Sequence, residues 1–89
     1  MSTCQMTFFN ETTDITATFS VNWNAVQVGS VTVGPQANGQ VGDELVTYHI
    51  QAVNAANGQF LAENNGVWGN AQVLLTWSEG LGYQLTPRS

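Results

Sequence analysis

Lysine is missing from this chain, and Arg88 is its only positively charged residue. Six acidic residues leave a formal net charge of −5 at pH 7. Nucleic-acid binding depends on lysine and arginine side chains that neutralise phosphates and release counterions, so we exclude nucleic acid as a partner. The same charge argues against docking on an anionic membrane through a basic patch, and it leaves open insertion through apolar side chains.

Cysteine and histidine are nearly absent as well. Cys4 is the only cysteine and His49 the only histidine, so the chain cannot form an intrachain disulfide or a zinc site of several Cys and His ligands. We expect Cys4 to be a small buried side chain and His49 a hydrogen-bonding surface residue. Asp43 and Glu44 form an acidic pair that could contribute to a calcium site, but we interpret them as a solvated turn and expect no cofactor.

Long apolar runs are also missing. The first ten residues, MSTCQMTFFN, lack the basic start and the apolar stretch of a signal peptide. No run approaches the roughly 20 apolar residues of a membrane span. We therefore expect no transmembrane segment, and a protein that is cytoplasmic or released without a signal peptide. Asn10, Glu11 and Thr12 match the N-glycosylation pattern, which we interpret as a turn.

The length of 89 residues suits one hydrophobic core, so we expect a single β-domain over residues 1–89. A domain of this size buries a limited share of its surface, and pairing with a second copy would bury more. The sequence therefore predicts a homodimer.

Strict alternation marks residues 15–24, ITATFSVNWN. Apolar side chains occupy every second position and uncharged polar side chains the positions between, which predicts a half-buried strand. We expect it to form an antiparallel hairpin with a strand at residues 5–10, across the connection NETTD.

Further strands are expected along the rest of the chain. The segment 25–33 should be interrupted at Gly29 and Ser30 and end at Gly34, and the segment 35–44 should be a loop or hairpin tip because of its Asn-Gly and Gly-Asp pairs. Hairpin turns are expected at Asn57-Gly58 and Asn65-Gly66. The other strands are expected at 45–53, 59–62, 67–77 and 83–85.

Six to seven short strands with turns between them predict an all-β fold, a small antiparallel β-sandwich or barrel. A short helix over residues 52–63 is the weaker alternative, because Gly58 would lie at its centre.

The inventory of catalytic groups is thin. Glu63 and Glu79 could form a pair of glycosidase carboxylates, but nothing in the sequence places them at a working separation. We therefore expect a protein that binds without catalysis.

The stretch NNGVWGN, residues 64–70, suggests a binding site. Trp68 lies between two glycines and breaks the strand alternation, so we expect it to be at least partly exposed, whereas Trp23 and Trp77 follow the alternation and should be core. Sugars have apolar C–H faces edged with hydroxyls, and flat aromatic rings beside amides and carboxylates suit them. The candidate ligand-binding residues are Asn64, Asn65, Trp68, Asn70, Glu63, Asp43 and Tyr83.

Two other polar surfaces are candidates. One would combine Asn22 and Asn24 with Gln72 and Tyr83, and the other Asn38 with Asp43 and Glu44. The sequence alone does not decide which of these groups converge.

The segments TFFNETT, FSVNWN and NNGVWGN, in a short lysine-free β-domain, resemble the small fruiting-body lectins of fungi. The resemblance is one of style over the whole chain, so it transfers no binding residue. It implies a galactose-type or related glycan, a homodimer, and a role in defence by cross-linking foreign glycans. Similarity to aegerolysin-like membrane binders is weaker, because those chains are longer.

The sequence therefore predicts a calcium-independent lectin whose partners are glycans or glycoconjugates. Two alternatives stay open. One is a structural or protein-interaction domain that associates through its polar strand edges, and the other is a membrane-active defence protein.

Overall fold

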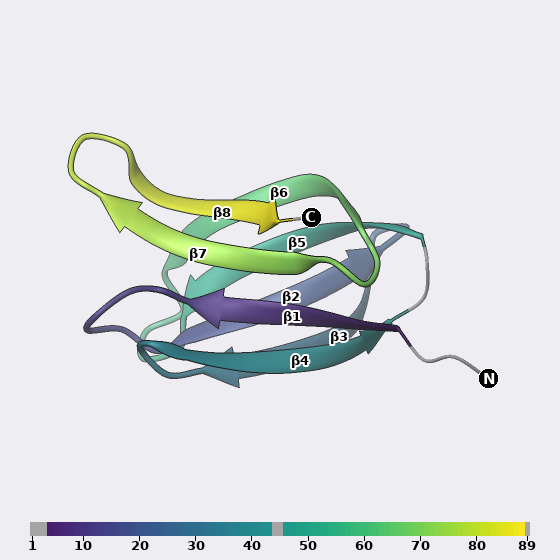
Figure 1. Ribbon diagram of the computed structural model, residues 1–89, viewed down its shortest axis with the longest axis horizontal. Coiled ribbons are helices and arrows are strands. Elements are labelled where there is room, and N and C mark those ends of the chain that lie inside the picture. The colour runs from purple at the N-terminus through teal and green to yellow at the C-terminus, as the bar shows by residue number, and fades with distance from the viewer. Residues whose placement is uncertain (1–3, 44–45, 89) are drawn as a thin grey trace.

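The protein is an eight-stranded β-sandwich in the computed structural model, which describes residues 4–43 and 46–88 (Figure 1). The described residues include no helix, so the helix considered over 52–63 does not form. The all-β sandwich predicted from the sequence is confirmed, with eight strands instead of six or seven. The strands are β1 (Cys4–Asn10), β2 (Ala17–Trp23), β3 (Val26–Val33), β4 (Ala37–Asp43), β5 (Thr47–Asn54), β6 (Phe60–Trp68), β7 (Gln72–Ser78) and β8 (Gly82–Arg88).

The strands form two sheets of four, in the orders β4-β1-β7-β8 and β3-β2-β5-β6. Neighbouring strands are antiparallel except β1 and β7, which run parallel. The predicted hairpin between residues 5–10 and 15–24 is wrong, because β1 and β2 lie in different sheets. The six residues between them carry the chain across the end of the sandwich.

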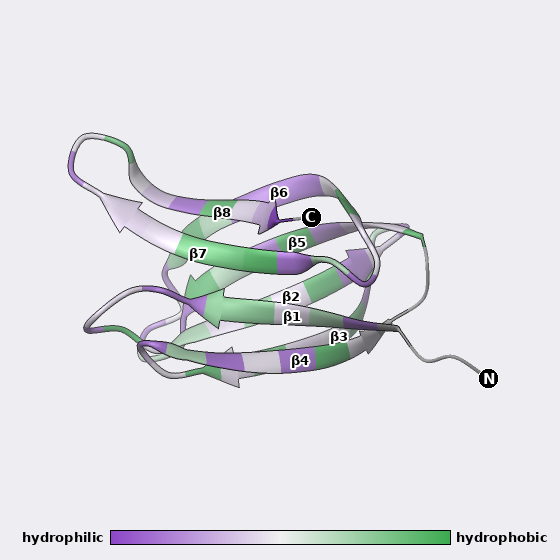
Figure 2. Cartoon of the chain, in the orientation of Figure 1, coloured by the Kyte–Doolittle hydropathy of each residue, from purple (hydrophilic) through white to green (hydrophobic). Residues whose placement is uncertain are grey.

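The core lies between the sheets and follows the alternation of the strands. On β2, Ala17, Phe19 and Val21 are fully buried, as predicted. Phe19 stacks on Phe8 of the facing sheet, with ring centroids 4.7 Å apart. Figure 2 shows β7 as hydrophobic along its middle, where Val73 and Leu75 are fully buried.

The two sheets approach closely where β3 faces β4. A Cβ atom on Gly39 would lie 2.9 Å from Val31 Cγ2 and 3.0 Å from Val33 Cγ2, and one on Gly29 would lie 2.5 Å from Val41 Cγ1. Each glycine therefore leaves the space that a valine of the facing strand fills.

This close approach explains why Ala37–Asp43 form strand β4, where a loop or hairpin tip was predicted for 35–44. Asn38 and Gly39 lie within β4, where Gly39 serves packing instead of a turn. The strand does end after Val33, before Gly34 and Pro35, as predicted.

The two other Asn-Gly pairs differ in role. Asn57-Gly58 forms the predicted turn between β5 and β6, with φ of 74° at Gly58. The predicted turn at Asn65-Gly66 is wrong, because both residues lie within β6. The β5–β6 register shifts between Tyr48 and His49, and Gly66 (φ 97°) is the extra residue of a bulge.

Three further boundaries differ from the prediction. β3 is continuous, and its register with β2 shifts at Val28 instead of breaking at Gly29 and Ser30. Asn24 and Ala25, both with positive φ, form a two-residue turn between β2 and β3. The expected strand 67–77 is divided, because β6 ends at Trp68 and the chain changes sheets before β7 begins.

Trp23 and Trp77 are not core residues as predicted, because 50% and 57% of their surfaces are exposed. Each follows the buried alternation of its strand. However, each lies at the strand end, beyond the region where the facing sheet covers the inner face. Alternation therefore shows which face of the sheet carries the tryptophan ring. It does not show whether the other sheet packs over that part of the face.

We expect Gly39→Ala to destabilise the protein by about 1–3 kcal/mol, because the added methyl group overpacks against Val31 and Val33. Gly42→Ala on the same strand is the matched control, since nothing lies within 4 Å of its Cβ position. Urea unfolding curves measure both variants. Equal stability of the two would contradict close packing between β3 and β4.

Candidate functional site

A pocket of about 340 Å³ opens at one end of the sandwich. The loop between β1 and β2 forms one side, and the β7–β8 hairpin, which projects beyond the sheets at the same end in Figure 1, forms the other. Its lining residues are Glu11, Thr12, Thr13, Asp14, Trp77 and Tyr83.

The buried side chain of Asn10, the last residue of β1, fixes the β1–β2 loop. Only 1% of its surface is exposed. Its Nδ2 donates to the carbonyl oxygens of Ile15 (2.9 Å) and Val33 (3.0 Å), and its Oδ1 accepts from the backbone N–H (3.1 Å) and the hydroxyl (2.5 Å) of Thr12. These four bonds use the amide's two donors and both acceptor lone pairs, so the loop has a fixed conformation before any ligand arrives.

Strand β7 and the turn between β3 and β4 hold the same loop at two further points. The Glu11 N–H donates to the Leu75 carbonyl of β7 at 2.9 Å. The Gln36 side chain, from the turn before β4, donates to the carbonyls of Glu11 (2.9 Å) and Thr12 (3.0 Å). The backbone of this wall of the pocket is therefore fixed at several points.

The opposite wall is aromatic. Trp77 and Tyr83 are direct partners across β7 and β8, so their side chains share one face of the hairpin. They lie on the face of buried Leu75, toward the inside of the sandwich. Tyr83 packs partly against the core, whereas the Trp77 ring is left available to a ligand.

A groove of about 470 Å³ begins on the other side of Tyr83 and runs between β6 and β8. Asn64 of β6 donates from Nδ2 to the Leu85 carbonyl of β8 at 3.0 Å, which links the two sheets along the groove. Glu63 lines it as well, and its Oε1 lies 2.7 Å from Nε2 of His49. Because Tyr83 lines both spaces, the pocket and the groove adjoin.

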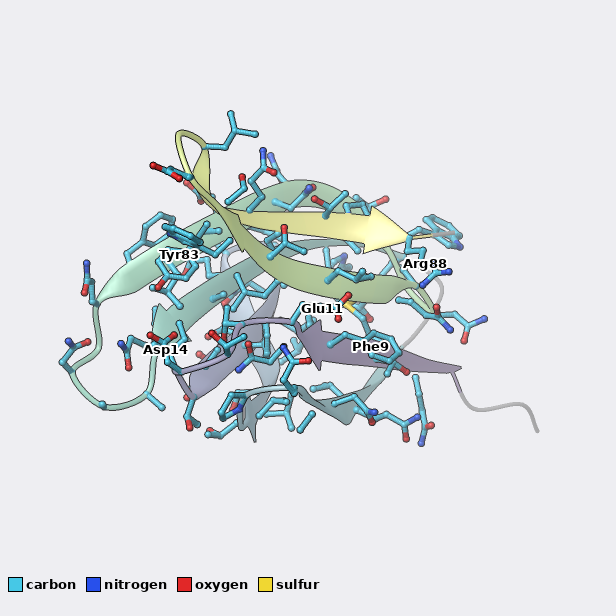
Figure 3. All side chains as sticks on the ribbon, turned by 60° about the vertical axis from the view of Figure 1, so that its left-hand side comes forward. Phe9, Glu11, Asp14, Tyr83 and Arg88 are labelled. Atoms are coloured by element: carbon cyan, nitrogen blue, oxygen red, sulfur yellow. The ribbon has the colours of Figure 1, made fainter. Side chains whose placement is uncertain are left out.

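The pocket is acidic. Among residues 4–43 and 46–88, the ion pair with nitrogen and oxygen within 4 Å joins His49 and Glu63. Within these residues, Glu11 and Asp14 therefore have no cationic partner. Arg88 lies opposite Gln72, five residues beyond Tyr83 along β8, or about 17 Å at strand spacing. Figure 3 shows Arg88 well apart from Asp14 and Tyr83.

The structure places the predicted site residues in several locations. Glu63, Asn64 and Tyr83 line the groove together. Trp68 is 56% exposed, which confirms the predicted exposure, but it lies with Asn65 on the outer face of the β3-β2-β5-β6 sheet, outside both the pocket and the groove.

Asn70 is in the turn between β6 and β7, with φ of 70°. The side chain of Asp43, and Glu44 as a whole, lie outside the described residues, as does the side chain of the expected core residue Cys4. The third predicted surface, around Asn38, is therefore not described as a unit.

The second predicted surface does not converge. Asn22 and Asn24 lie at the end of β2, and Asn22 donates to the His49 carbonyl at 3.3 Å. Gln72 and Tyr83 belong to the other sheet, at opposite ends of the β7–β8 pair.

Sequence reasoning missed Trp77 and the loop residues Glu11 to Asp14 as parts of the site. One available signal was the turn SEGLG directly after Trp77, which places this ring at the tip of a hairpin. The other was NETTD, a polar and acidic segment between two strands.

Comparisons with known proteins show the fold alone. No family model matches the chain, and no curated protein does. Among solved structures it is similar to the NMR structure of a protein from Eubacterium rectale, with a TM-score of 0.70 and 16% identity over 98% of this chain and 89% of that one.

Two kinds of feature do not occur among the described residues. They contain no helix long and apolar enough to cross a membrane. They also contain no group of three or more His, Cys, Asp or Glu side chains arranged to hold a metal ion.

We expect Asn10→Ala to lower the free energy of unfolding by roughly 2–4 kcal/mol, because buried partners of its amide lose their hydrogen bonds. The melting temperature should fall by about 10 °C or more for a domain of this size. Asn38→Ala, an exposed amide on β4, is the control and should change it little. Similar thermal scans of the two variants would show that the Asn10 bonds do not hold the loop.

Proposed function

We propose that the protein binds carbohydrate without catalysis, and that its site is the pocket between the β1–β2 loop and the β7–β8 hairpin. One observation carries the proposal: an exposed indole, Trp77, faces a fixed loop that bears two carboxylates and two threonines around a space of about 340 Å³. This size lies at the lower end of the range for small-molecule sites.

The chemistry of the two walls suits a sugar ring. The flat Trp77 side chain offers an apolar face to the C–H groups of a pyranose. Asp14 is a strong acceptor for sugar hydroxyls, and the exposed Thr13 hydroxyl can both donate and accept. Because Asn10 fixes the loop, little conformational entropy is lost on binding.

The adjoining groove supports a ligand longer than one sugar unit. It begins at Tyr83, which it shares with the pocket, and offers Glu63, Gln84 and Thr86 as polar contacts beside the apolar Phe60. A chain of sugars that passes over the Tyr83 ring would occupy both spaces.

The carboxylate pair considered for glycoside hydrolysis from the sequence, Glu63 and Glu79, does not share a pocket. Glu63 of β6 pairs with His49 of β5, at 2.7 Å between Oε1 and Nε2. Glu79 lies in the β7–β8 turn, and neither the pocket nor the groove is lined by both residues.

Trp77→Ala should weaken glycan binding by at least about 30-fold, as expected when a central aromatic contact is removed. Trp68→Ala is a closely matched control, because Trp68 is 56% exposed and Trp77 57% exposed. A glycan array first identifies the ligand, and titration calorimetry then compares the variants. Both should unfold within about 1 kcal/mol of the parent protein.

Two results would contradict this proposal. If the glycan array shows no binding at high protein concentration, the protein does not bind carbohydrate and the proposal is wrong. Loss of binding in Trp68→Ala with none in Trp77→Ala would move the site to the outer face of the β3-β2-β5-β6 sheet.

A second proposal, that the chain pairs with another copy of itself, is favoured by the opposite end of the sandwich. Trp23 and Val26 are direct partners across β2 and β3 and are 50% and 61% exposed, and Val28 beside them is 51% exposed. If two copies associate through the ends that carry Trp23 and Val26, these side chains become buried. The two carbohydrate pockets then lie at the two far ends of the dimer. Two weak sites held together gain avidity on multivalent glycans.

Sedimentation velocity should then show a species of twice the chain mass of 9.6 kDa. The double variant Trp23→Ser, Val26→Ser should sediment as a monomer, whereas Leu81→Ser, which changes a 69% exposed side chain at the pocket end, should not alter the dimer. A monomeric parent protein at high concentration would rule out this mode of association.

A further inference from the structure

We infer that His49, which lines neither the pocket nor the groove, sets the preference of the site for a chain of sugars over a single sugar. It does so by holding the carboxylate of Glu63, which lines the groove where a further sugar ring would lie beyond Tyr83. His49 is therefore a positioning residue that acts on the ligand through Glu63. The inference rests on the proposed function and names the residue that controls the length of the ligand.

The contact between the two side chains is short and runs diagonally across β5 and β6. His49 is the direct partner of Asn65, so the Glu63 side chain reaches along the sheet to meet the imidazole. Nε2 of His49 lies 2.7 Å from Oε1 of Glu63. An ionised carboxylate has no proton to donate, so the imidazole N–H is the donor and the hydrogen bond is charge-assisted.

This bond orders a side chain that would otherwise be flexible. The side chains of His49 and Glu63 are 32% and 53% exposed, and an exposed pair adds little to the stability of a fold. Its effect on binding is different, because a ligand that fixes a flexible side chain loses part of its binding free energy. With Oε1 bonded to His49, the carboxylate is ordered before the ligand arrives, and Oε2 is left to accept from a sugar hydroxyl.

Asn64 supplies a second ordered acceptor next to Glu63. Its Nδ2 donates to the Leu85 carbonyl at 3.0 Å. Because a carbonyl accepts only from the nitrogen of an amide, this bond sets the orientation of the Asn64 side chain. Its Oδ1 has no hydrogen-bond partner among the described residues. Two consecutive residues of the groove are thus held by other strands and suit a ligand that brings several hydroxyl donors.

No other basic side chain of the described residues holds Glu63. The chain has no lysine, and Arg88 belongs to the other sheet and forms no ion pair there. The direct partners of His49 on the neighbouring strands, Asn22 and Asn65, are uncharged. Loss of the imidazole therefore leaves the carboxylate of Glu63 free to move.

The test compares a single sugar with a chain. The probes are the monosaccharide and the linear tetrasaccharide of three neutral β-1,4-linked series, those of glucose, galactose and N-acetylglucosamine. NMR titration measures weak and tight binding alike. The parent protein should bind a tetrasaccharide at least about 10-fold more tightly than its monosaccharide.

His49→Ala should reduce the affinity for the tetrasaccharide by about 3- to 10-fold, because Glu63 must then be ordered on binding. The affinity for the monosaccharide should not change, since a single ring is bound in the pocket at Trp77. His49→Gln, whose amide N–H can donate to Glu63, should recover most of the loss. Gln51→Ala is the matched control, because Gln51 lies on the same strand as His49 and is the direct partner of Glu63. It should change neither affinity.

A double-mutant cycle shows whether His49 acts through Glu63. Glu63→Ala should lower the affinity for the tetrasaccharide by at least as much as His49→Ala does. Adding His49→Ala to Glu63→Ala should then cause no further loss. Additive losses would mean that His49 contacts the ligand or acts on the fold, and the inference would be wrong.

The outcomes separate this inference from the function on which it rests. Three results overturn the inference and leave carbohydrate binding intact: equal losses for the two probes in His49→Ala, a loss in Gln51→Ala as large as in His49→Ala, or a tetrasaccharide that binds no more tightly than its monosaccharide. The same holds if none of the three series binds while the array shows other glycans. An array without any binding overturns both.

Discussion

The side chain of Asn10 is the interaction on which the rest of this end of the molecule depends. Its buried amide joins the end of β1, the end of β3 and the loop to β2 through four hydrogen bonds. Because β1 and β2 belong to different sheets, the connection between them must cross the end of the core, where unpaired backbone groups would be costly. The same bonds that satisfy those groups also fix the loop that forms one side of the pocket, opposite Trp77. Stability and the geometry of the pocket therefore have one cause.

The two ends of the sandwich differ in what they expose. At one end the β1–β2 loop and the β7–β8 hairpin enclose a polar and aromatic pocket. At the other end Trp23 and Val26 extend beyond the core around a tight turn. The core between them is filled by alternating side chains, and glycines on β3 and β4 let the sheets approach. This arrangement separates a face suited to a hydroxylated ligand from one suited to a protein surface.

Much of the fold follows from the sequence, because alternation determines which side chains share a face. The inner face of β2 was predictable in this way. The partners of β1 were not, since the choice between a hairpin and a crossing to the other sheet depends on tertiary packing. Gly39 and Gly66 illustrate a second limit: after asparagine, glycine resembles a turn signal, whether it serves a turn, a bulge or a close contact. The pocket was missed because Trp77 is in phase with Leu75, and alternation contains no information on where the facing sheet ends.

The irregularities of the strands have a consequence for a chain with so few charges. Soluble sheet proteins often protect edge strands with lysine, and this chain has none. Among the described residues, two edge strands carry a register shift instead, and a third contains a proline. Val28 shifts the register of β3, Gly66 adds a bulge to β6, and Pro87 removes an N–H donor from β8. Backbone irregularity thus opposes the edge-to-edge stacking of one copy on the next. Unlike charge repulsion, which salt screens, this effect does not depend on the salt concentration.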